Sequence, residues 1–131
     1  MQTKTITIEG QRIYDIPSFY EEINRVFMAE EDWKLAPSLD ALHDMLYCDY
    51  GATHGHESIT LIWKNMDKSR AGLGIETTVA YYQEKLRHPE TFNTKKIRES
   101  LHALQQNAGP TYFDIVLEII AEHPHIKLQA A

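Results

Sequence analysis

Residues 38–46 read Ser-Leu-Asp-Ala-Leu-His-Asp-Met-Leu and follow Pro37. Pro37 and Ser38 are typical of a helix start, and the apolar residues behind them recur at the spacing of one helical face. Those expected to point inward are Leu39, Leu42, Met45 and Leu46. Four polar residues at positions i, i+3, i+4 and i+7 share the other side, namely Asp40, His43, Asp44 and Tyr47. The stretch therefore predicts a helix with an outward strip of two carboxylates, an imidazole and a phenol.

Three segments around this helix have the pattern of β-strands, namely residues 4–8, 58–63 and 125–129. The first alternates polar with β-branched apolar residues and ends at the turn Glu9-Gly10. The second is a largely apolar run, and the third follows the break at His123-Pro124.

Apolar residues at helical spacing predict further helices at residues 16–27, around 75–86, around 97–104 and from Thr111 to Ile120. Pro17 fits the first turn of the earliest of these helices, and Ser18 with Glu21 has the spacing of a capping box. The order strand, helices, strand predicts an α/β fold with parallel crossover connections.

Length and composition favour one domain over residues 1–131. The chain is 43% hydrophobic and 24% charged, as in proteins that bury a core. No apolar run approaches about 20 residues, and the chain start lacks the apolar segment of a secretion signal. The lone cysteine, Cys48, excludes an internal disulfide. A cytoplasmic location is the expectation.

The net charge of −6 disfavours nucleic acid and anionic membranes as partners. Its distribution is uneven, because residues 30–50 hold six carboxylates against one lysine, while residues 64–98 hold eight basic against four acidic residues. These two segments could pair within the chain, across a dimer, or with separate partners.

Enzymatic and metal-binding roles find little support in the residue pattern. Cys48, His54 and His56, with His123 and His125 further on, could suggest zinc, but His-x-His in a glycine-containing loop lacks a second ligand pair of familiar spacing. Loop histidines without a metal are the ordinary alternative. Nucleophile motifs, phosphate loops and dinucleotide fingerprints are absent from the sequence. We expect a protein that is not an enzyme and needs no cofactor.

Several segments together resemble the barstar family of ribonuclease inhibitors. Residues 8–13, Ile-Glu-Gly-Gln-Arg-Ile, are similar to the family's opening strand and glycine turn, and residues 38–46 are similar to its helix pattern N-L-D-A-L-W-D-x-L. Leu61 to Lys64 resembles its second strand, and Phe113 to Leu128 its last helix and strand. The resemblance leaves residues 66–110 as an additional helical insertion.

The resemblance implies a three-stranded parallel sheet packed by helices, whose second helix and preceding loop enter a ribonuclease active site. By position, Asp40 and Asp44 match the helix carboxylates that meet the enzyme's cationic groups, and His43 stands where the family has an aromatic residue. Glu118 aligns with an acidic contact on the last helix. Residues 33–37 differ from the family's aromatic and glycine loop, which suggests a different ribonuclease target.

Two aromatic residues complete the expected partner-binding set. Trp33, beside the acidic loop, fits either an exposed binding anchor or the edge of the core. Tyr47 lies on the outward strip, although a structural role suits it as well.

We therefore expect a cofactor-free inhibitor of a ribonuclease, either a toxin domain or a secreted enzyme, with an immunity or antitoxin role and a monomeric or weakly dimeric state. An acidic strip at helical spacing is also common on ordinary solvated surfaces. The alternative is a non-inhibitory interaction module that uses the basic segment 64–98.

Overall fold

The computed structural model describes residues 3–47, 51 and 58–131. Its elements run in the order β1 (Thr3–Glu9), the 3-10 turn η1 (Gly10–Arg12), α1 (Ile16–Phe27), α2 (Leu39–Met45), β2 (Ser58–Lys64), α3 (Met66–Gly72), α4 (Ile75–Leu86), α5 (Thr94–Gln105), α6 (Tyr112–Ala121) and β3 (Ile126–Ala130). The expected α/β class is confirmed. α3 is an element that the sequence pattern did not predict.

The three strands form one parallel sheet in the order β1-β2-β3. Thr3 of β1 pairs with Ser58 of β2, and Ile59 of β2 pairs with Ile126 of β3. The predicted three-stranded parallel sheet is therefore confirmed, with β2 at its centre.

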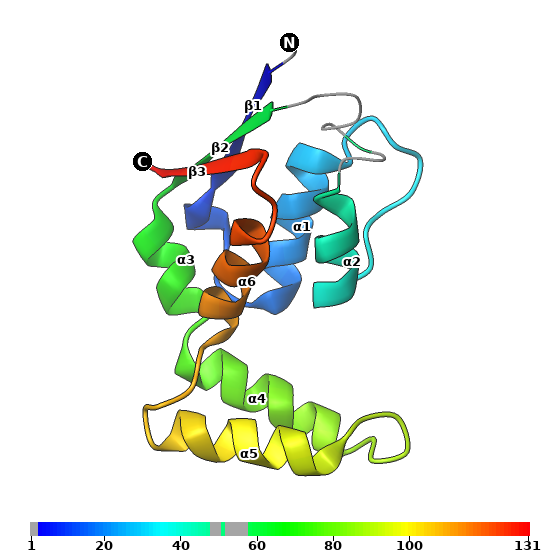
Figure 1. Cartoon of the computed structure of the whole chain (residues 1–131), viewed down its shortest axis with the longest axis vertical. Coiled ribbons are helices and arrows are strands. Elements are labelled where there is room, and N and C mark those ends of the chain that lie inside the picture. Colours follow the sequence, from blue (N-terminus) through cyan, green and yellow to red (C-terminus); the bar gives the residue numbers. More distant parts are fainter. Residues whose placement is uncertain (1–2, 48–50, 52–57) are drawn as a thin grey trace.

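Among the described residues, helices cover one face of the sheet (Figure 1). Alternate side chains are buried, namely Ile6, Ile8, Ile59, Leu61 and Trp63. Figure 1 shows α1, α2, α3 and α6 together on one side of the sheet, with the α4 and α5 hairpin beyond them. The intervening residues of β1 and β2 are only partly buried, because successive side chains of a strand point to opposite faces.

The core is built around Trp63 on the central strand. Its ring stacks on Phe19 at 6.2 Å between centroids and meets Phe113 edge-on at 5.5 Å. Its Nε1 donates to Ser69 Oγ at 2.9 Å, and Ser69 Oγ donates to the carbonyl of Gly10 at 3.2 Å. This chain of hydrogen bonds satisfies the buried indole and ties β2, α3 and η1 together.

The start of α1 differs from the expected capping box. Asp15, not Ser18, is the N-cap, since its Oδ1 accepts from the Ser18 amide at 2.9 Å and Ser18 Oγ accepts from the Asp15 amide at 3.0 Å. Pro17 already lies within the first turn, where its missing N–H costs nothing, so the cap must come before it.

Gly10 provides a test of this packing. A Cβ at Gly10 would lie too close to the backbone carbonyl oxygens of Lys64 and Asn65. Gly10→Ala should lower the free energy of unfolding by about 3 kcal/mol, at the upper end of the overpacking range. The exposed neighbour substitution Gln11→Ala should stay within about 0.5 kcal/mol of the parent. Equal urea midpoints for the two variants would contradict this packing.

Candidate functional site

Helix α2 carries the centre of the candidate site. Ser38 caps it, with Oγ accepting from the Ala41 amide at 3.1 Å. Leu42, Met45 and Leu46 are fully buried. Each such side chain stabilises the fold by about 1.5–3 kcal/mol, whereas a like-charged pair at i, i+4 costs only a few tenths of a kcal/mol. Burial therefore fixes the rotation of α2 and turns its acidic side outward.

The predicted strip faces solvent as expected. Asp40 and Asp44 are exposed, and neither forms an ion pair within the described part of the chain. Tyr47, at the end of the helix, has 58% of its surface exposed. Two carboxylates thus stand one turn apart on a fixed helix and have no ion-pair partner among the residues that the structure describes.

His43 occupies the middle of the strip and is held by a residue from another helix. Its Nε2 donates to Oε2 of Glu122, at the end of α6, over 2.7 Å. Both side chains keep contact with solvent. The pair links α2 to α6 and orients the imidazole. Sequence reasoning missed Glu122, because a pair 79 residues apart leaves no local pattern.

Glu118 lies exposed on α6, one turn before Glu122. Because α2 packs against α6, the structure places Glu118 on the helix beside the acidic strip. It brings five of the six predicted residues onto these two neighbouring helices and their ends.

Four rings, called here the histidine cluster, contact one another at the strip. They belong to His43, Tyr47, His123 and His125. The ring of His123 is 4.7 Å from those of both His43 and Tyr47, and 5.9 Å from that of His125. His125 Nε2 donates to the carbonyl of Leu46 at 3.0 Å, which joins the end of α2 to the residue before β3.

His123 is the buried member of the cluster. Only 2% of its surface is exposed, and its Nε2 has no hydrogen-bond partner within the described structure. Burial above all, then the imidazoles of His43 and His125, lowers the pKa of His123 below the ordinary 6.5, against the opposing effect of Glu122. A neutral His123 packs under the strip without adding positive charge to it.

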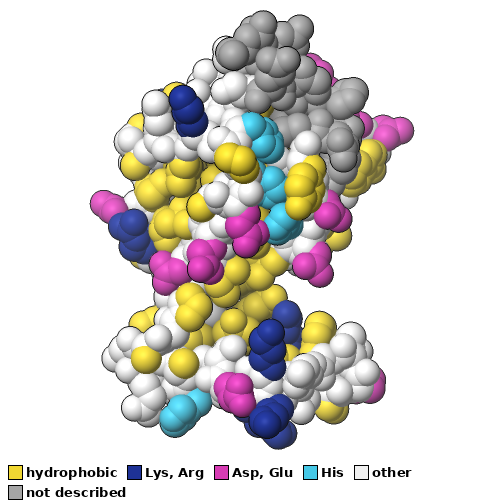
Figure 2. Space-filling view, viewed as in Figure 1, with side chains coloured by type: hydrophobic (Ala, Val, Ile, Leu, Met, Phe, Trp, Pro, Cys, Tyr) yellow, Lys and Arg dark blue, Asp and Glu magenta, His cyan; other side chains and the backbone are white. Residues whose placement is uncertain are grey.

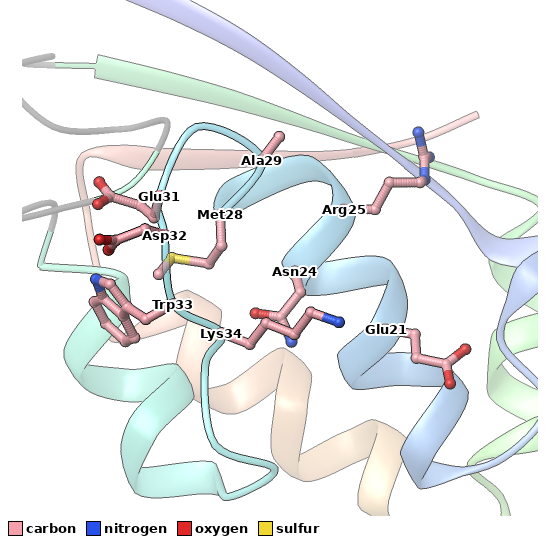
Figure 3. Close-up of a pocket in the computed structure, with 9 residues that line it drawn as sticks. All are labelled: Glu21, Asn24, Arg25, Met28, Ala29, Glu31, Asp32, Trp33 and Lys34. Carbon is pink, nitrogen blue, oxygen red and sulfur yellow. The ribbon is translucent and has the colours of Figure 1, made fainter.

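Trp33, the sixth predicted residue, lines an open cleft of about 470 Å³ between α1 and the loop that leads to α2. Figure 3 shows the side chains of Glu31, Asp32 and Trp33 together at one end of this cleft. Asn24 of α1 fixes the loop, because its Oδ1 accepts from the Leu35 amide at 2.7 Å and Leu35 is buried. Glu31 Oε1 accepts from the Gly51 amide at 3.0 Å.

The cleft offers two carboxylates beside an indole ring. At its opposite end, Arg25 is already engaged by Glu22, which it contacts through Nε at 2.7 Å and Nη2 at 2.6 Å. Carboxylates and an indole can together bind a guanidinium or an ammonium group.

Neither a metal site nor a membrane span is found within the described ranges. Histidine, cysteine and acidic residues do not gather there in a group that could hold a metal ion. The described helices are all too short or too polar to cross a bilayer. Cys48, His54 and His56 lie outside the described residues.

Comparison with known proteins identifies a family. A family model described as Barstar (barnase inhibitor) matches residues 3–95. The matched range begins with β1, runs through α2, β2, α3 and α4, and ends at the second residue of α5. It therefore includes much of the segment 66–110 that the sequence resemblance left as an insertion. No curated protein matches the chain.

The buried histidine makes stability depend on pH. Since the folded state holds the pKa of His123 below 6.5, the unfolded state takes up a proton first as the pH falls. The contribution of a neutral His123 is therefore complete well above pH 6.5 and is lost progressively as the pH falls below 6.5. The urea midpoint should fall over this range, and by less in His123→Phe. An equal fall in both proteins would contradict the assignment.

Proposed function

Because the chain belongs to the barstar family, we propose that it inhibits a ribonuclease by covering the enzyme's active site with α2 and the loop before it. A ribonuclease binds a polyanion, so its cleft carries arginine, lysine and histidine side chains. One observation carries the proposal: Asp40 and Asp44 on α2 are exposed and form no ion pair in the described part of the chain. These carboxylates would occupy the positions of RNA phosphates.

The fixed rotation of α2 suits this role. Two carboxylates at i, i+4 repel each other slightly in the free protein, and a cationic cleft would relieve that repulsion. Preorganised negative charge speeds encounter with a positive surface and contributes to specificity. Because the buried side of α2 already holds the helix in place, little conformational entropy is lost when the partner binds.

The other residues extend the contact around this pair. His43, oriented by Glu122, would present its ring where the family has an aromatic residue, and Tyr47 and Glu118 would flank it. On the loop side, the cleft at Trp33 and Asp32 would receive an arginine or lysine side chain of the enzyme. We further propose that the enzyme is a toxin domain and that the chain is its cytoplasmic immunity protein.

Inhibition can be measured directly on two sources of enzyme. The first is purified barnase with an RNA substrate, and the second is the ribonuclease activity of extracts from the source organism. The proposal expects the chain to suppress cleavage in at least one of them with one-to-one stoichiometry. Undiminished cleavage in both, at a large excess of folded protein, would overturn it.

Charge reversal tests the residues. Asp40→Lys combined with Asp44→Lys should weaken inhibition by about 100-fold or more, because two attractive contacts become repulsive in a desolvated interface. The matched control reverses two exposed glutamates of the hairpin, Glu76→Lys with Glu99→Lys, and should leave inhibition within a few-fold of the parent. Equal inhibition constants for the two folded double variants would contradict the site.

A further inference from the structure

The α4 and α5 hairpin is firmly joined to the rest of the molecule. Thr78 of α4 is buried, and its Oγ1 accepts from the Tyr112 amide at 2.7 Å. The ring of Tyr81 meets that of Tyr112 at 5.0 Å, and Tyr112 in turn shares a 2.6 Å hydroxyl contact with Tyr20 of α1. Side chains on the hairpin are therefore held at a defined place relative to α6.

The hairpin carries four cations without an acidic partner among the described residues, called here the basic patch: Lys85, Lys95, Lys96 and Arg98. Within the described part of the chain none of them forms an ion pair, whereas neighbouring Arg87 pairs with Glu84. Lys85 is positioned by two rings, with Nζ 4.6 Å from the centroid of Tyr81 and 4.9 Å from that of Phe92.

Apolar surface accompanies these cations. Lys85 and Lys96 line a hollow together with Tyr82, Phe92 and Ile97. Phe92, 36% exposed, is among the most exposed large apolar residues of the structure. An aromatic surface flanked by two lysines that form no ion pair in the described structure has the composition of a protein contact surface.

The acidic surface of the body and the basic surface of the hairpin lie on the same face of the molecule. Figure 2 shows a group of acidic side chains on the body and lysine or arginine side chains on the hairpin of a single face, although each part also carries a few side chains of the other charge. Hydrophobic side chains lie at the waist between body and hairpin (Figure 2). The acidic strip and the basic patch do not reach each other within one chain, because no ion pair joins α2 to the hairpin in the described residues.

We propose that this face binds a second copy of the chain in a two-fold symmetric dimer. A two-fold axis at the apolar waist between body and hairpin would place the hairpin of each protomer against α2 and α6 of its partner. Each basic patch then meets the acidic strip of the partner, so that this contact forms twice in the dimer, and the apolar waists meet at the centre. The contact has an apolar middle and a charged rim, as protein interfaces do.

A second copy fits better than other occupants. The net charge of −6 disfavours RNA and anionic lipid, and the basic patch would repel a ribonuclease cleft. Two chains of equal net charge repel each other, but at physiological ionic strength salt screens this repulsion between charges more than about 8 Å apart. The attractive contacts between opposite charges within the interface are shorter and are screened much less. Given the proposed function, dimer and inhibitory complex would use the same side of α2 and exclude each other.

Sedimentation equilibrium of the full chain tests the dimer without any other protein. In about 50 mM salt the average mass should rise with concentration from 15.2 kDa toward twice that value, and the dissociation constant should increase at least tenfold in about 500 mM salt. Lys85→Glu with Lys96→Glu should also weaken the dimer at least tenfold. Adding Asp40→Lys and Asp44→Lys to that variant should restore association. Positive charge then lies on α2 and negative charge on the hairpin, so the two surfaces attract each other again.

The control Lys64→Glu with Lys68→Glu makes the same charge change outside both patches and should leave association within twofold of the parent. Circular dichroism checks that every variant is folded. A parent chain that stays monomeric at a few hundred micromolar in low salt would overturn the proposal. So would a dimer that the four-residue exchange fails to restore. Neither result depends on whether the chain inhibits a ribonuclease.

Discussion

Burial of one side of α2 is the constraint on which the rest of the structure depends. A helix of seven residues is not stable alone in water, so α2 exists because Leu42, Met45 and Leu46 pack into the core. That packing leaves the helix no freedom to rotate. The acidic side chains on its opposite face are consequently presented at fixed positions, although their mutual repulsion opposes the arrangement.

Much of this could be predicted from sequence because the signals are local. Alternation in residues 4–8 and helical spacing in residues 38–46 gave the right elements, the right buried side and the outward strip. α3 was missed because its sequence, Met-Asp-Lys-Ser-Arg-Ala-Gly, has almost no apolar periodicity; it is held by Ser69, which joins Trp63 to Gly10. The pair His43 and Glu122 depends on tertiary contact between two helices, and no spacing rule foresees it.

Three sets of polar groups that lack a partner among the described residues bear on binding. Asp40 and Asp44 lack cations, the basic patch lacks anions, and the buried Nε2 of His123 lacks a hydrogen-bond partner in the described structure. Elsewhere the buried polar groups are satisfied, as with Glu22, which accepts from Arg25 and from the Glu9 amide at 2.7 Å. Local conflicts of this kind are typical of surfaces shaped for binding rather than for stability alone.

Hydrogen exchange of the chain, free and bound to the ribonuclease it inhibits, tests the central claim most directly, because it locates the contact without substitution. The account predicts slower amide exchange in residues 39–46 and around Glu118 to Glu122, with α3 unchanged. Slower exchange confined to α3 and β3, with α2 exchanging as in the free chain, would contradict it.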